Sequence, residues 1–252
     1  MSEIPEGAVL IQPTPFAPLI DWWGTTAENA EWKPRLATPA KRAREHLNAF
    51  FLDHGFARVF WKNRAEVVPN KVWRSNQPSV RDLEWAAAQG IKTVVTARSG
   101  INFGAYPLER EACERLGLDF RVFAFSSRQP PDVALMQAAP AFFEEIRYPV
   151  LFHCKSGADR AGFLSALYLA LHEGVEPRKA AEEQLNWRFG HSRAAKTGML
   201  DHVFVHYERA RAATGIGFGE WLATAYDPAA IAADFTPAPL ADLFASRWTG
   251  HE

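Results

Sequence analysis

Residues 150–162, with the sequence VLFHCKSGADRAG, hold the side chains whose types and spacing best suit chemistry. An apolar run leads to Cys154, and Arg160 stands six positions later, where a helix is expected to begin. Successive backbone N–H groups at the start of a helix form a cradle for an anion, and their dipoles favour a thiolate at its rim. The planar guanidinium group of an arginine can hold two oxygens of the same anion. This spacing therefore predicts a cysteine that attacks phosphorus.

Short apolar runs alternate with helical patterns ahead of this stretch. Strands are predicted within 65–79, where there are two short runs, and at 91–97, 119–125 and 149–154. Helices are predicted at 38–55, 79–90, 107–117 and 131–146, the last disturbed at Pro140, and then at 161–173, 176–189, 195–213 and 218–226. Thr38 and Ser79 are the predicted N-caps of the first two helices.

This order of elements predicts an α/β fold, with a mostly parallel central sheet of about four to five strands and helices on both faces. Sites in such sheets form at the carboxyl ends of the strands. Cys154 directly follows the last predicted strand, so it stands where a site is expected.

The composition excludes several classes of protein. A formal net charge of −1 over 252 residues gives no overall attraction to nucleic acid, so none is expected as a partner. Two cysteines make no disulfide framework, and the N-terminus lacks the pattern of a signal peptide, so we expect a cytoplasmic protein. The longest apolar run, 161–171, is shorter than the roughly 20 residues that a membrane-spanning helix needs.

The stretch HCKSGADR resembles HCxxGxxR, the active-site signature of the cysteine-dependent protein tyrosine phosphatase superfamily. Upstream, VWRSNQPS (72–79) and GIKTVVTARSG (90–100) resemble the bacterial and fungal dual-specificity-like branch. The resemblance covers residues 65–175 and extends more weakly to 213. It implies a protein tyrosine phosphatase-like fold and hydrolysis of a phosphate monoester through a phosphocysteine, without a metal or any other cofactor.

The resemblance also assigns roles within the loop. Cys154 is the expected nucleophile, and Arg160 is expected to bind the phosphoryl oxygens and stabilise the transition state. His153 is expected to orient the loop and to help keep the cysteine ionised. The remaining residues, whose backbone amides are expected to line the cradle, are Lys155, Ser156, Gly157, Ala158 and Asp159.

The general acid that protonates the leaving group is left open by the sequence. Relatives carry an aspartate before the prolines of the loop 125–132, FSSRQPPD, where this chain has Ser126 and Ser127. Asp132, the carboxylate of that loop, suits the acid and suits equally the N-cap of the following helix. Asp159 competes, since myotubularin-type lipid phosphatases resemble this chain in carrying an aspartate just before the arginine. A third reading is that neither residue is the acid.

Ala161 is the other departure, because the superfamily usually has a serine or threonine directly after the arginine. That hydroxyl helps the thiolate to leave, so its absence favours an alternative function, a phosphoryl-binding protein with little or no turnover. Sulfur transfer and arsenate reduction are less favoured. Such reactions either do not require this Cys–Arg spacing, or they require partner thiols, which a chain with two cysteines hardly supplies. Cys113 is expected in the core. The lesser alternative comes from the resemblance, since some lipid-directed relatives have a cysteine in a similar location that can pair with the nucleophile on oxidation.

Cationic side chains expected around the loop indicate a negatively charged substrate. Lys155 lies in the loop, Arg98 ends a predicted strand and Arg128 lies in the acid loop. The run 186–198 adds further basic residues, of which Arg193 and Lys196 are the expected substrate contacts. The expected partner is therefore a phosphoprotein, with tyrosine or dual specificity, or a polyanionic inositol phosphate or lipid. Surface charge is the ordinary alternative for each of these side chains.

Three segments are predicted from these patterns. Residues 1–64 form an N-terminal extension with one helix, 65–213 form the phosphatase-like catalytic domain, and 214–252 form a helical tail packed on that domain.

Overall fold

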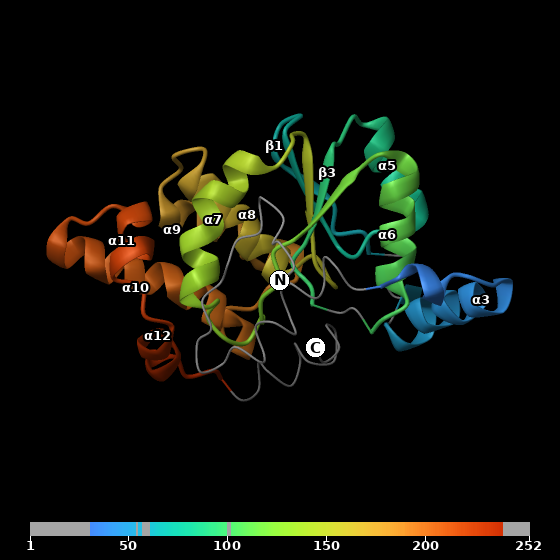
Figure 1. Cartoon of the computed structure of the whole chain (residues 1–252). Coiled ribbons are helices and arrows are strands. Elements are labelled where there is room, and N and C mark those ends of the chain that lie inside the picture. Colours follow the sequence, from blue (N-terminus) through green and yellow to red (C-terminus); the bar gives the residue numbers. More distant parts are fainter. Residues whose placement is uncertain (1–30, 54, 57–60, 100–101, 239–252) are drawn as a thin grey trace, which may run out of the picture.

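A five-stranded sheet lies at the centre of the computed structural model, which describes residues 31–53, 55–56, 61–99 and 102–238 (Figure 1). The strands are β1 (Ala65–Val68), β2 (Val72–Ser75), β3 (Thr93–Thr96), β4 (Asp119–Val122) and β5 (Val150–His153). Their order is β1-β2-β5-β3-β4, and all neighbours are parallel except β1 and β2. The predicted fold class is therefore confirmed, and β5 takes the central position between β2 and β3.

Helices cover both faces of the sheet (Figure 1). On one side lie α5 (Val80–Ala88), α6 (Ala105–Leu116) and, beyond them, α3 (Pro39–Leu47). On the other side lie α7 (Val133–Glu145), α8 (Asp159–Leu171), α9 (Pro177–Gln184), α10 (Met199–Thr214), α11 (Phe218–Thr224) and α12 (Pro228–Asp234). Short turns of helix complete the described elements: η1 (Lys33–Arg35), η2 (Asn48–Leu52), η3 (Trp187–Phe189) and η4 (Lys196–Gly198).

Local signals explain where several helices begin and end. The Ser79 hydroxyl accepts a hydrogen bond from the Asp82 amide, and the Asp82 carboxylate accepts one from the Ser79 amide, which is a capping box at the start of α5. The Thr38 side chain caps α3 by accepting a hydrogen bond from the Lys41 amide. Both predicted caps are thus confirmed. Gly117 ends α6 in the left-handed conformation, at φ 68°, which a residue without Cβ adopts at little cost.

The later helices differ from their predicted ranges. α8 begins at Asp159 rather than 161, and its sides are buried almost all round because its sequence is apolar on every face. α9 ends at Gln184, since Asn186 caps the separate turn η3 through the Arg188 amide. α7 continues through Pro140 to Glu145, so the expected disturbance does not end the helix.

The segments on either side of the domain are described in part. α11 packs against α7 and α10, and α12 packs against α10, so residues 214–238 lie on the helical side of the domain. Residues 1–30 and 239–252 of the predicted extensions lie outside the described residues. The three predicted segments, 1–64, 65–213 and 214–252, stay a prediction. Among the described residues, no helix combines the length and apolar character needed to cross a bilayer.

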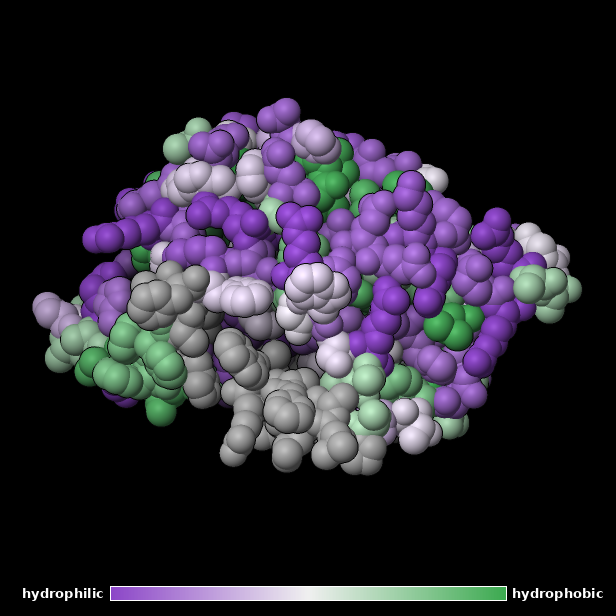
Figure 2. Space-filling model, turned by 180° about the vertical axis from the view of Figure 1, so that it is seen from behind, coloured by the Kyte–Doolittle hydropathy of each residue, from purple (hydrophilic) through white to green (hydrophobic). Residues whose placement is uncertain are grey.

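An aromatic core fills the space between the sheet and α7 and α8. Phe143 is fully buried, and its ring lies 5.4 Å from the ring centroid of Tyr168 and 6.1 Å from that of Phe152. By contrast, Figure 2 shows apolar surface at the end of the molecule formed by α3 and η2, where Phe51 is 61% exposed. Phenylalanine rings therefore occur both in the buried core and at the exposed surface.

Replacing Phe143 with alanine should lower the free energy of unfolding by about 3–5 kcal/mol, because it removes buried apolar surface and leaves a cavity. Phe51→Ala is the matched control and should change it by less than about 0.5 kcal/mol. Urea denaturation followed by intrinsic fluorescence measures both. Equal effects from the two variants would contradict this description of the core.

Candidate active site

The loop that carries Cys154 lies at the carboxyl end of the central strand. β5 ends at His153, Cys154 follows at 1% exposure, and α8 begins five residues later at Asp159. The ends of the flanking parallel strands bring Gln77, after β2, and Arg98, after β3, to the same edge of the sheet. The edge predicted to hold a site thus brings these groups together.

The four carbonyls of the loop from Lys155 to Ala158 each accept a hydrogen bond from another part of the chain. The donors are the Gln77 amide to Lys155 (3.2 Å), Asn63 Nδ2 to Ser156 (3.0 Å), and Arg74 Nη2 to Gly157 (2.6 Å) and to Ala158 (3.0 Å). In a planar trans peptide the N–H group points away from the carbonyl, so the amides that follow these carbonyls face away from the outside donors, and the Ala158 amide donates to Ser156 Oγ at 3.3 Å. The Gly157 amide donates to Cys154 Sγ at 3.2 Å. The loop is therefore an amide-lined cradle with the sulfur at its base.

Arg74, on β2, is the residue that fixes this geometry, and the sequence analysis missed it. Its guanidinium group is fully buried and also donates to the Gln184 carbonyl at 2.6 Å and side chain at 3.0 Å. Burial lowers the pKa of Arg74 to about 10, while the nearby Cys154 and Asp159 act to raise it, so the group stays charged at neutral pH. The sequence feature that could have indicated this role is a charged residue within the predicted strand VWRS.

A second buried group lies on the other flank of the loop. His191 Nδ1 lies 2.7 Å from Asp159 Oδ1, and its Nε2 lies 2.5 Å from Asp201 Oδ2. Burial alone would lower the pKa of His191, but the hydrogen bonds to the two carboxylates outweigh it and raise the pKa to about 9. Arg193 donates to Asp201 at 3.0 Å and so joins this cluster. Asp159 is therefore held by a protonated histidine at neutral pH.

A network of buried polar side chains joins the loop to α6 and to the segment after α3. His153 Nε2 lies 2.7 Å from Glu109 Oε1, although without the alignment of a hydrogen bond. Gln77 donates to Glu109 at 2.7 Å and accepts from Arg98 at 2.7 Å. Arg98 then donates to both carboxylate oxygens of Asp53, at 2.8 and 3.0 Å. The network that begins at His153 thus ends at Asp53, about 100 positions earlier in the chain.

Asp53 also affects the cations expected to contact a substrate. Lys155 Nζ lies 3.9 Å from Asp53 Oδ1, and the side chains of Lys155, Arg98 and Asp53 are all buried. Two positive charges at this edge of the sheet therefore share one internal carboxylate, which offsets one of them. This role of Asp53 was not predictable, because no functional pattern surrounds it in the sequence.

The other predicted site residues lie on separate elements. Asp132 caps α7 by accepting a hydrogen bond from the Leu135 amide at 2.9 Å. Arg128 is partly buried in the loop between β4 and α7, and Lys196 is exposed on η4. Arg160 is buried in the first turn of α8. Arg193 is connected to the loop through Asp201, His191 and Asp159.

Cys113 lies on α6 in a small apolar cluster with Leu83 and Val94, on the face of the sheet away from the cluster that includes Cys154. Burial raises the pKa of the Cys113 thiol well above its usual range. These surroundings favour core packing over pairing with Cys154.

Comparison with known proteins identifies the class. A family profile described as "Swiss Army Knife protein, DSP-PTPase phosphatase domain" matches residues 62–201, which is more than half of the chain. The fold, the thiol-bearing loop and this match define a cysteine-dependent phosphatase of the protein tyrosine and dual-specificity type. The chain belongs to the PTP-SAK family. No curated protein sequence matches the chain.

Solved structures with a similar fold share low sequence identity with this chain. TpbA from P. aeruginosa is 22% identical, over 56% of this chain and 89% of its own, with a TM-score of 0.44. Tk-PTP in its active form is 21% identical, over 56% and 94%, with a TM-score of 0.45. The core catalytic domain of the PP-IP phosphatase Siw14 from S. cerevisiae is 17% identical, over 62% and 94%, with a TM-score of 0.45. Similarity at this level carries no argument about the substrate.

Gly157→Ala should distort the loop, because Gly157 has φ +75° and a Cβ there would lie 2.6 Å from the Asn76 backbone nitrogen. Gly174→Ala is the matched control, since Gly174 has φ +67° but open space around the added carbon. The control should lose about 1–2 kcal/mol of stability from backbone strain alone. Thermal unfolding should show a larger loss for Gly157→Ala, together with weaker binding of orthovanadate. Identical behaviour of the two variants would refute the close packing of β2 against the loop.

His191 should make stability fall as the pH rises. Its pKa is about 9 in the folded protein and about 6.5 unfolded, so its contribution is complete below about pH 6.5 and is lost as pH rises through about 9. The contribution is on the order of 3 kcal/mol. Thermal midpoints of the wild type between pH 6 and 9.5 should therefore decline more steeply than those of His191→Gln. Parallel profiles would show that the histidine is not held protonated.

Proposed function

We propose that this chain hydrolyses phosphate monoesters through a phosphocysteine formed on Cys154. The observation that carries the proposal is the anchoring of four loop carbonyls from outside, which leaves the amides directed inward around the sulfur. Such a cradle stabilises both a thiolate and the equatorial oxygens of a phosphoryl group. In the first step the thiolate attacks phosphorus, the S–P bond forms and the bond to the leaving oxygen breaks. In the second step water attacks, the S–P bond breaks and phosphate leaves.

Arg160 is the proposed clamp on the phosphoryl oxygens. It lies in the first turn of α8, where its planar group can face the same anion as the amides. Lys155, Ser156, Gly157 and Ala158 supply the remainder of the cradle. His153 is proposed as a positioning residue, because its side chain faces Glu109 within the buried network.

The contacts favour Asp132 over Asp159 as the general acid. Asp159 Oδ1 lies 2.7 Å from Nδ1 of the buried, protonated His191, so this carboxylate already has a charged partner within the protein. Asp132 lies in the loop after β4, and its carboxylate is engaged by one backbone amide. We therefore propose Asp132 as the acid and Asp159 as a residue that positions the start of α8.

Internal ion pairs bear on the class of substrate. Lys155 and Arg98 share the carboxylate of Asp53, and Arg193 faces Asp201, so the protein itself balances part of the positive charge expected around the loop. Arg128 and Lys196 are the remaining predicted contacts. This balance supports a substrate with one phosphate group, such as a phosphoprotein, over a highly charged inositol phosphate or lipid.

Ala161 supports the alternative, a phosphoryl-binding protein with little turnover. Its methyl group is fully buried in the core, so no hydroxyl stands directly after the arginine to help the thiolate leave. In that case the phosphocysteine would form and persist. Release of phosphate, rather than binding, separates the two functions.

Phosphate release should therefore be measured with the reduced wild type and Cys154→Ser. The panel holds phosphotyrosine and phosphoserine peptides, phosphoinositides, inositol polyphosphates and an aryl phosphate. We expect release by the wild type that Cys154→Ser abolishes, with the monophosphate peptides preferred. Retained activity in Cys154→Ser would exclude the cysteine mechanism. Labelling of Cys154 without continued release would establish the binding alternative.

Asp132→Asn and Asp159→Asn separate the two candidate acids. Loss of the acid should lower kcat by about 10²–10⁴ for poor leaving groups and remove the alkaline limb of the pH profile, with less effect on a good leaving group. We expect that pattern from Asp132→Asn. Asp159→Asn should instead lower the thermal midpoint and leave the shape of the pH profile unchanged. The reverse pattern would assign the acid to Asp159.

A further inference from the structure

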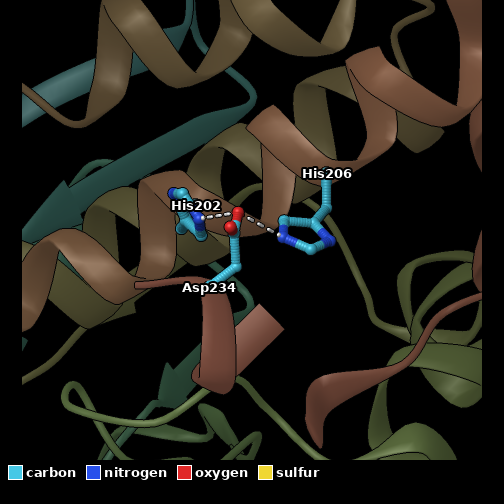
Figure 3. Close-up of side chains that lie close together, drawn as sticks. All are labelled: His202, His206 and Asp234. Carbon is cyan, nitrogen blue, oxygen red and sulfur yellow. Dashed lines mark hydrogen bonds and ion pairs between the residues drawn. The ribbon is translucent and has the colours of Figure 1, made fainter. Parts of the chain in front are cut away.

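A group of metal-ligating side chains lies outside the cysteine loop, between α10 and α12. His202 and His206 are one helical turn apart on α10, so their rings project from the same face. Asp234 is the last residue of α12. Figure 3 shows both rings turned toward the Asp234 carboxylate, with His202 Nε2 at 2.9 Å and His206 Nε2 at 3.1 Å from Oδ2. Three potential ligand atoms therefore converge at one point.

The contacts at Asp234 exceed what one oxygen accepts well. Besides the two imidazoles, Arg209 Nη1 also donates to the same oxygen, Oδ2. A carboxylate oxygen has two lone pairs, whereas three donors approach this one. A divalent ion would resolve the crowding, because it takes electron pairs from both imidazoles and from the carboxylate at once. Arg209, at 59% side-chain exposure, is free to turn aside.

The spacing is close to that of a tetrahedral metal site. Zinc lies about 2.0–2.2 Å from nitrogen and oxygen ligands, which places tetrahedral ligands about 3.3 Å from one another. The present distances of 2.9 and 3.1 Å need to lengthen by only a few tenths of an ångström. The side chains of His202, His206 and Asp234 are 17%, 20% and 43% exposed, so an ion can reach them from solvent. The Phe235 ring, 5.4 Å from that of His202, restrains one ligand.

We propose that His202 Nε2, His206 Nε2 and the Asp234 carboxylate bind a divalent transition-metal ion of the zinc type. Two imidazoles and one carboxylate suit zinc and its neighbours, whereas magnesium and calcium prefer oxygen ligands. The remaining coordination position faces solvent. The site is separate from the cysteine loop and does not depend on its chemistry.

The ion would attach α12 to α10. α12 has seven residues, too few for a stable helix on its own, and it buries Ile231 against the domain. A metal bridge between α10 and α12 adds a second attachment at the opposite end of this short helix from its Asp227 cap. Metal binding should therefore raise the stability of the folded chain.

The test uses the full chain without an affinity tag and with Cys154→Ser, so that neither a tag nor the loop thiol binds the ion. Zinc is titrated against a chromophoric chelator to obtain stoichiometry and Kd. We expect one ion per chain, and a rise of about 5–10 °C in the thermal midpoint at a hundredfold excess over Kd. Binding absent above the background of the triple variant His202→Ala, His206→Ala, Asp234→Asn would overturn the proposal.

Single variants identify the ligands. His206→Gln, which keeps a hydrogen-bond donor near Asp234, should weaken zinc binding by at least about tenfold, as should Asp234→Asn. His46→Ala, an exposed histidine on α3, is the matched control and should leave Kd unchanged. Arg209→Ala should bind zinc as tightly as the parent or more tightly, since it removes a competing cation. Zinc binding that His206→Gln and Asp234→Asn leave unchanged would place the ion elsewhere and refute the site.

Discussion

The buried guanidinium of Arg74 is the interaction on which the loop geometry depends. A charge taken out of water is costly, and it persists here because its nitrogens donate to three backbone carbonyls and one side-chain amide. Two of those carbonyls belong to Gly157 and Ala158, so the guanidinium holds the loop from behind while its amides face forward. Cys154 and Asp159 lie near enough to act on the pKa of Arg74, which they raise against the effect of burial. One residue thus fixes the backbone of the cradle from behind.

Two polar clusters extend this support to distant parts of the chain. On one flank, Asp159, His191 and Asp201 connect the first turn of α8 with the start of α10. On the other flank, the network from His153 ends at Asp53, in the segment after α3. Gln77, Arg98 and Asp53 are paired within the second cluster, whereas His153 approaches Glu109 without an aligned hydrogen bond. Elements outside the sheet thus supply partners for residues around the loop, which ties the segment after α3 to the site.

Much of the fold and the identity of the loop were predictable, because they depend on local signals. Thr38 and Ser79 marked helix starts, the short apolar runs marked strands, and the spacing of Cys154 and Arg160 marked the cradle. Arg74, Asp53 and His191 were not predicted as supports of the loop. Their partners lie tens to more than a hundred positions away, and no periodicity in one sequence reports such pairs. The choice between Asp132 and Asp159 as general acid was open for the same reason, since the role of a carboxyl group depends on its neighbours in the folded chain.

The aspartates of this chain show how far neighbours decide the role of one side-chain type. Asp53 is fully buried against a guanidinium and serves charge balance. Asp159 pairs with the buried, protonated His191, which fixes the carboxylate at the start of α8. Asp132 accepts a hydrogen bond from one backbone amide at the start of α7, in the loop after β4 where the general acid is proposed. Asp234 lies at the surface among nitrogen donors, where a metal ion satisfies the carboxylate and both imidazoles together. Burial and partner type, rather than the carboxyl group itself, separate charge balance, positioning, proton transfer and metal binding.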